Sequence, residues 1–193
     1  MPLIIVPHRR RREGKTNYRK RLKTVKSKKL RFVVRKSSRQ IYCQLIEYQT
    51  KGDKTLLSSN SLELAKFGWN ADGGNLPAAY LTGFLCGLKA KKNKIESAIM
   101  DTGLYTSVHG SRLYATLKGA VDAGLQIPHS EEAFPSTERI SGSHIANYAA
   151  KLKKEKPTVY KKQFSKYLSS KVNPEDLTKL FEATKAKILA EGT

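Results

Sequence analysis

The stretch LPAAYLTGFLCGLKA, residues 76–90, predicts a buried helix at the centre of the fold. Its small residues Ala79, Gly83 and Gly87 recur every four positions, so they form one smooth strip, whereas the leucines lie on another face. Such a strip allows a second backbone to approach closely. The apolar run from residue 76 to residue 88 has 13 residues, against the roughly 20 that a membrane-spanning helix needs. We therefore expect a central helix of a soluble protein rather than a membrane span.

Three strands are predicted before this helix. Residues 30–35 alternate apolar residues with arginine, and after a Ser-Ser turn residues 41–48 place apolar residues at every second position. This pattern indicates a hairpin. Arg31 and Arg35 are then expected to point outward and to extend a positive surface onto the sheet. Residues 54–61 offer a third strand.

The segments that flank the central helix complete the core. A short helix is expected near residues 62–68, followed by the exposed loop NADGGN, residues 70–75, whose last Asn caps the central helix. After it, SAIMD (residues 97–101) predicts a short buried strand, and Ser111 is expected to cap a helix that ends at Gly124. Helix, strand, loop and helix in this order indicate an α/β fold.

Beyond residue 135 the pattern predicts helices alone. From residue 151 onward there are 11 lysines against five acidic residues, and we expect these helices to dock on the core or on RNA. Their buried faces are expected to comprise Ile145, Tyr148, Ala149, Leu152, Tyr160, Phe164, Tyr167, Leu168, Leu177, Leu180, Phe181 and Ile188. The predicted organisation is thus a basic N-terminal arm (1–29), an α/β core (30–134) and an all-helical C-terminal extension (135–193).

Positive charge is concentrated near the N-terminus. Of the 32 residues from His8 to Arg39, 16 are Lys or Arg and only Glu13 is acidic, so this segment supplies +15 of the net charge of +21. Such density favours a polyanionic partner. A solvated charge run and an anionic membrane surface are the alternatives. Arginine favours nucleic acid because it binds phosphate in a bidentate manner, and residues 16–26 lack the broad apolar face of a membrane-bound helix.

RNA is favoured over duplex DNA as the nucleic-acid partner. The sequence contains no helix-turn-helix, zinc finger or basic zipper. A flexible basic arm joined to a structured sheet suits irregular folded RNA, which is read by shape and backbone.

The chemistry-bearing residues argue against catalysis. A metal-dependent nuclease is the alternative function, with Asp53, Glu63, Asp101 and Asp122 as candidate metal ligands. The simpler reading is that Asp101 organises the turn DTGLY and that Asp122 lies on the outer face of its helix. The sequence contains no nucleotide-binding, nucleophile-elbow or zinc motif. We expect neither an enzyme, nor a cofactor, nor a metal, nor a small-molecule substrate.

Cys43 and Cys86 lie in apolar surroundings at a spacing that fits neither a disulfide framework nor a metal knuckle, so they are expected to be buried thiols in a reducing compartment. The N-terminal MPLIIVP is too short for the apolar region of a signal peptide and runs directly into four arginines. A cytoplasmic location is therefore expected.

Several stretches resemble one protein family: RRRREGKTNYRKRLK (9–23), LPAAYLTGFLCGLKA, MDTGL, KGAVDAGLQIPHS (118–130) and YKKQFSKYL. They are similar to the L-eighteen family of large-subunit ribosomal proteins, called L-five in eukaryotes, and the helical extension resembles the archaeal form. The resemblance implies an α/β core with a mixed sheet and packed helices, in a ribonuclease H-like layout without catalytic carboxylates. It also implies binding of 5S rRNA in the central protuberance, with large-subunit rRNA and neighbouring ribosomal proteins as further partners.

The same resemblance implies which residues contact rRNA. The arm is the expected threading element, and the hairpin arginines come next. The loops NADGGN (70–75) and SVHGSR (107–112) are expected to supply secondary contacts. Tyr18 is a candidate for base stacking, with packing against the core as the alternative, and Lys118 is either a phosphate contact or a solvated lysine. The expected set is Arg9, Arg10, Arg11, Arg12, Lys15, Tyr18, Arg19, Lys20, Arg21, Lys23, Lys26, Lys28, Lys29, Arg31, Arg35, Arg39, His109, Arg112 and Lys118.

Overall fold

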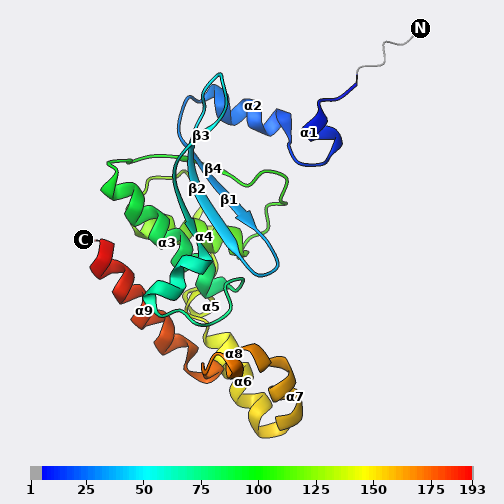
Figure 1. Ribbon diagram of the computed structural model, residues 1–193, viewed down its shortest axis with the longest axis vertical. Helices are drawn as coiled ribbons and strands as arrows, with labels where there is room; N and C mark the ends of the chain where they lie inside the picture. Colours follow the sequence, from blue (N-terminus) through cyan, green and yellow to red (C-terminus); the bar gives the residue numbers. More distant parts are fainter. Residues whose placement is uncertain (1–5, 193) are drawn as a thin grey trace.

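A four-stranded mixed sheet organises the computed structural model, which describes residues 6–192 (Figure 1). The strand order is β3-β2-β1-β4, with β1 antiparallel to β2 and parallel to β4. The strands are β1 (Arg31–Lys36), β2 (Ile41–Glu47), β3 (Lys54–Asn60) and β4 (Ile99–Asp101). The predicted α/β fold with a mixed sheet is therefore confirmed.

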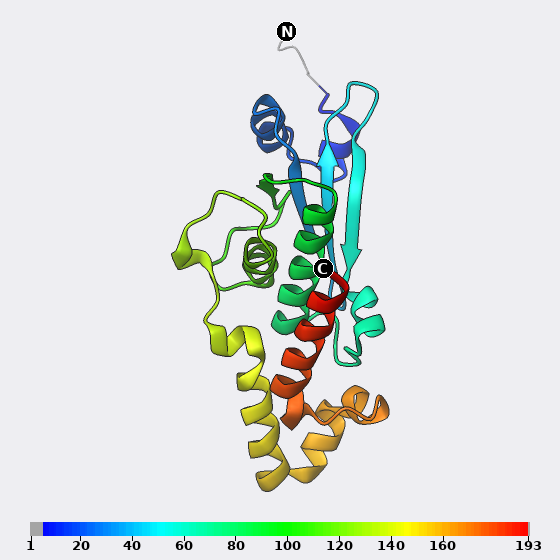
Figure 2. The ribbon, with the colours of Figure 1, turned by 90° about the vertical axis from the view of Figure 1, so that its left-hand side faces the viewer.

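One face of the sheet packs against α3 (Leu76–Lys92), which is buried along most of its length. Asn75 caps it as predicted, because its Oδ1 accepts a hydrogen bond from the Ala78 N–H. Helix α4 (Arg112–Asp122) crosses α3 at the predicted small-residue strip (Figure 2). A Cβ atom at Gly83 would lie 1.9 Å from the Thr116 carbonyl oxygen, so the crossing requires glycine there. Ser111 lies at the N-cap of α4, but its hydroxyl makes no capping bond.

Alternate residues of the hairpin divide between two faces, as a strand period of two requires. Phe32, Val34, Ile41, Cys43 and Leu45 are all fully buried in the core under α3. On the opposite face the prediction for one arginine is wrong. Arg31 is 3% exposed rather than part of an open surface, because two carboxylates and the arm cover it.

Cys43 and Cys86 are buried free thiols, as expected. Burial raises the pKa of Cys86 to about 12 and raises the pKa of Cys43 well above its ordinary value. Both side chains therefore behave as small apolar groups of the core.

The short helix expected near residues 62–68 is present as a 3₁₀ helix, Ser61–Phe67, but the loop that follows it differs from its prediction. The glycines of NADGGN are packed rather than exposed: a Cβ at Gly74 would lie 2.6 Å from the Ser38 carbonyl oxygen. The loop therefore lies against the β1–β2 turn, which explains its glycines by close backbone approach.

The C-terminal region is helical, as predicted, and its last helix returns to the core. Helix α9 packs on α3, where Leu81 and Leu177 are fully buried and Tyr80 contacts Phe181 at 5.6 Å between ring centroids. The helices are α5 (Thr137–Ser141), α6 (Ser143–Glu155), α7 (Pro157–Gln163), α8 (Ser165–Ser169) and α9 (Leu177–Gly192), with single 3₁₀ turns at Glu131–Ala133 and Pro174–Asp176.

A smaller apolar cluster holds the far end of this region together. Ala149 and Leu152 of α6 pack there with Tyr160 and Phe164. Two predicted members are instead solvent-facing, since Tyr148 is 47% exposed and Leu168 is 39% exposed. None of the helices within residues 6–192 combines the length and hydropathy of a membrane span.

The basic arm lies at the other end of the molecule (Figure 1). It contains two helices, α1 (Arg9–Arg12) and α2 (Tyr18–Lys26), the second close to the predicted bounds of 16–26. The MPLII part of the N-terminal apolar segment lies outside the described residues.

Candidate nucleic-acid interface

Helix α1 consists of four arginines, all exposed. The His8 carbonyl accepts hydrogen bonds from the N–H groups of Arg11 and Arg12, and Gly14 then reverses the chain with φ +64°. Glu13 is the acidic residue of this turn, and it pairs with Arg9 at 3.7 Å and with Lys15 at 2.9 Å. The turn therefore presents more positive charge than its single carboxylate can neutralise.

Helix α2 has little apolar packing. Asn17 caps it by accepting a hydrogen bond from the Lys20 N–H. No residue of α2 is buried, and Leu22 is 57% exposed. Short helices without tertiary packing are marginal in water, so α2 needs another attachment to the sheet.

That attachment is ionic. Arg21 of α2 binds Asp53 in a bidentate manner, with its two terminal nitrogens 2.8 and 2.9 Å from the carboxylate oxygens. Asp53 lies in the β2–β3 connection, so one ion pair links the arm to the sheet. Within residues 6–192, its two hydrogen bonds are the only side-chain hydrogen bonds between α2 and the strands or their connections.

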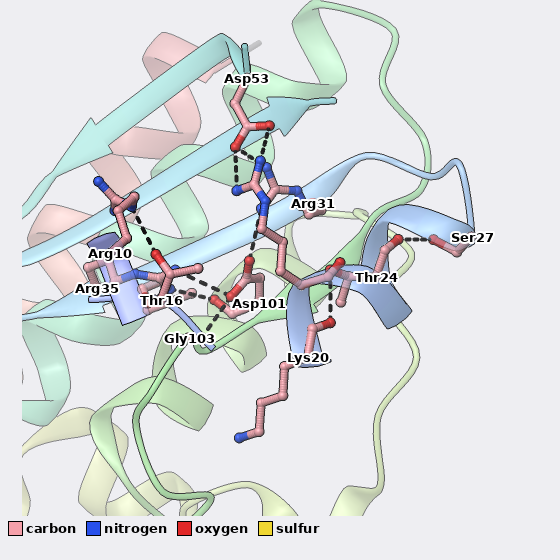
Figure 3. A network of polar contacts seen from close by, with 12 residues as sticks. Arg10, Thr16, Lys20, Thr24, Ser27, Arg31, Arg35, Asp53, Asp101 and Gly103 are labelled. Atoms are coloured by element: carbon pink, nitrogen blue, oxygen red, sulfur yellow. Dashed lines mark hydrogen bonds and ion pairs between the residues drawn. The ribbon is translucent and has the colours of Figure 1, made fainter. Parts of the chain in front are cut away.

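Asp53 also belongs to a larger network of hydrogen bonds and ion pairs (Figure 3). Arg31 lies between two carboxylates, with 2.5 Å to Asp53 and 3.1 Å to Asp101. Asp101 in turn accepts from Arg35 at 3.3 Å and from the Gly103 N–H at 2.8 Å. We call Arg21, Asp53, Arg31, Asp101 and Arg35 the ion-pair ladder. It connects the arm, β1, the β2–β3 connection and the end of β4.

The ladder explains how a guanidinium can be buried. Removing Arg31 from water is costly unless its charge is paired, and two carboxylates provide that pairing. Burial alone would raise the pKa of Asp53, but hydrogen bonds from Arg21 and Arg31 outweigh it and lower that pKa below its ordinary value. The bond to Asp53 raises the pKa of Arg21. Both charges are thus stabilised by the contact.

The carboxylates considered for a nuclease have other partners. Asp53 and Asp101 bind arginines, and Asp101 also organises the DTGLY turn as predicted. Glu63 binds Lys89 at 2.5 Å, and the exposed Asp122 accepts the hydroxyl of Tyr80 at 2.8 Å. In the part of the chain that the structure describes, no three His, Cys, Asp or Glu side chains group as metal ligands would. The geometry gives the nuclease hypothesis no support.

The structure brings part of the predicted RNA-contact set together. The arm residues and Arg35 gather at one end of the sheet, where the cations Lys20, Lys23 and Lys26 are exposed. Tyr18 is half-buried and its ring lies 5.0 Å from that of His8, so its contact is within the arm. The exposed members of this group are Arg9, Arg10, Arg11, Arg12, Lys15, Arg19, Lys20, Lys23, Lys26, Lys28 and Lys29.

The remaining predicted residues lie elsewhere. Arg39 is exposed in the β1–β2 turn, and Arg112 donates to the carbonyls of Ser37 and Gly74, which ties that turn to the loop before α3. Lys118 is half-buried between Asp122 at 3.1 Å and the ring of Phe134. His109 is exposed beside Tyr114. None of these four side chains lines the hollow between the arm and the sheet among the described residues.

Sequence reasoning considered Asp53 and Asp101 only as candidate metal ligands, and for Asp101 as the residue that organises a turn, and it missed their pairing with arginine. The available signal was their position, because Asp53 directly precedes an expected strand and Asp101 closes another, both near the arginine-rich hairpin. Their pairing with Arg31 spans 22 and 70 residues of sequence, so only the fold shows it.

A comparison with protein families agrees with the charge distribution. The model for "Ribosomal large subunit proteins 60S L5, and 50S L18" matches residues 5–98 and 88–130, which together cover more than half of the chain. The matched region includes the arm, the whole sheet, α3 and α4. The family predicted from the sequence is therefore confirmed. The chain belongs to this family, and it is accordingly a structural, RNA-binding protein of the large ribosomal subunit that takes part in translation.

Proposed function

We propose that the protein binds 5S rRNA and attaches it to the large-subunit rRNA in the central protuberance, with the arm as its principal contact. The observation that carries this proposal is a dense group of exposed arginines and lysines held at one end of the sheet by the ion-pair ladder. The guanidinium group of arginine can bind a phosphate in a bidentate manner. An arm that is already attached to the sheet loses less conformational freedom when it binds RNA.

Charge neutralisation supplies the affinity in this proposal. Among residues 6–192, Glu13 is the only acid that forms an ion pair with any of the eleven exposed cations of the arm. Neutralised phosphates release counterions, which makes the affinity fall as salt rises. The sheet and loops then position the arm on folded RNA by shape rather than by base sequence.

The other end of the molecule supports a second role. The helical extension carries exposed lysines together with the exposed side chains of Tyr148 and Val159. We propose neighbouring ribosomal proteins of the central protuberance as further partners.

The test is the salt dependence of 5S rRNA affinity. We expect log K to fall linearly with log salt, with a slope of about −0.7 to −0.9 per phosphate neutralised. Replacing Arg9, Arg10, Arg11 and Arg12 by Gln, or deleting residues 1–29, is expected to flatten this slope sharply. The matched control replaces four exposed lysines of the extension by Gln, namely Lys154, Lys156, Lys161 and Lys162.

Two outcomes contradict the proposal. A slope that stays the same without the arm arginines removes the arm as the principal contact. Equal competition by duplex DNA or anionic vesicles removes specificity for 5S rRNA and leaves a general polyanion binder.

A further inference from the structure

A hollow of about 180 Å³ lies between the arm and the sheet. It opens over the face of β1 opposite to α3, where Val33 and Arg35 contribute to its wall. The arm closes it from the other side with the chain between α1 and α2. Among the described residues its basic lining side chains are Arg10, Lys15, Lys20, Arg21, Arg31 and Arg35.

The charges around this hollow do not cancel. Its lining includes two carboxylates, Asp53 and Asp101, which the arginines of the ladder already bind. Arg10 donates from Nε to the Thr16 hydroxyl at 2.9 Å, a neutral partner. Among the described residues neither Arg10 nor Lys20 has an ion-pair partner. The hollow is therefore a concentrated positive site with unused donors.

Two further features favour an anion there. Asn17, the cap of the nine-residue helix α2, lines the hollow, so the positive end of that helix lies beside it. In addition, Arg31, which lines the hollow and is 97% buried, has a buried Nε–H group without a hydrogen-bond partner. A buried N–H donor without a partner is unfavourable. An anion in the hollow would offset the excess positive charge around this guanidinium.

We propose that this hollow binds one phosphodiester group of the RNA backbone, and that Asp53 is the positioning residue that builds the site. Asp53 touches no RNA in this proposal. It holds Arg21, and through it α2, so that Lys20 lines the hollow together with Arg10 and Arg35. The inference rests on the proposed RNA-binding function and adds to it a defined phosphate site and an acidic residue that promotes RNA binding.

Asp53→Asn separates this role from simple electrostatics. Removing an acid from an RNA-binding surface would ordinarily strengthen binding, whereas loss of the arm's attachment weakens it. Without that attachment the phosphate site is not formed in the complex, and loss of one charge-assisted contact should raise the apparent Kd for 5S rRNA about tenfold. The salt slope should also shrink by about 0.7 to 0.9, the value for one phosphate. Glu47→Gln, the matched control, removes the same charge at the end of β2. It should not weaken binding and should leave the salt slope unchanged.

A double-mutant cycle checks the route through Arg21. In the Arg21→Gln background, Asp53→Asn should have no further effect on the slope, because the link is already broken. Thermal melting of each variant shows whether the fold is retained. If Asp53→Asn does not fold, Lys20→Gln replaces it, with Lys51→Gln as control: only the former should reduce the slope by the value for one phosphate.

The failures of the two proposals can be told apart. Tighter or unchanged binding by Asp53→Asn overturns the phosphate site while leaving RNA binding intact. Binding by the full chain that does not depend on salt overturns the proposed function itself.

Discussion

The two ends of this molecule are both rich in cations, but they are held by different forces. The arm has no buried residue in either helix and depends on charge pairs. The C-terminal extension carries 11 lysines, yet it has its own apolar cluster and shares a second one with α3. Positive charge is therefore no guide to how firmly a segment is folded. Whether its apolar side chains are buried in a cluster decides that.

The largest effect is expected in the extension. Leu177→Ala removes a fully buried side chain from the cluster shared by α9 and α3, and should lower the free energy of unfolding by about 2–5 kcal/mol. Leu22→Ala, the same substitution on exposed α2, should change it by less than about 0.5 kcal/mol. Urea unfolding measures both. Equal losses would show that the arm is packed as firmly as the extension.

A smaller and more local effect is expected from Arg21→Gln. Its ion pair with Asp53 is partly exposed, so the global free energy of unfolding should fall by less than about 1 kcal/mol. Amide hydrogen exchange should nevertheless accelerate in α2 while α6 and α9 keep their protection. Unchanged protection of α2 would mean that something other than Asp53 holds the arm.

Acidification should produce the smallest effect on the whole fold. The pKa of Asp53 is lowered in the folded protein, so its contribution is fully present above the ordinary carboxyl value and is lost as pH falls through the lowered one. The arm should therefore stay attached at pH 5 and be released only below roughly pH 4. Amide chemical shifts of α2, followed during an acid titration, report the release. Release near neutral pH would contradict the role of Asp53.

Local patterns in the sequence predicted most of the fold. The strip at Ala79, Gly83 and Gly87 indicated a close helix crossing, which Gly83 makes against Thr116. The cap at Asn75 was also predictable, because its hydrogen bond from the Ala78 N–H lies within three residues.

What the sequence could not show depends on contacts between distant residues. The alternation of apolar residues with arginine placed Arg31 on the side of β1 opposite to α3. Its burial, however, depends on Asp53 in the β2–β3 connection and on Asp101 at the end of β4. NADGGN has an exposed-loop composition, yet its glycines serve close packing against the β1–β2 turn. The cations of the candidate site could be predicted from the sequence. The pairing of Asp53 and Asp101 with the arginines could not.

The parallel pairing of β4 with β1 has a consequence for the newly made chain. Arg31 obtains its second carboxylate from a residue 70 positions later, so the complete ion-pair ladder cannot form until more than half of the chain has been synthesised. Ribosomes add roughly 5–20 residues per second, so the arm is made first and fixed in place seconds later. During that interval the most basic segment of the protein is free to meet a polyanion before its own sheet is complete.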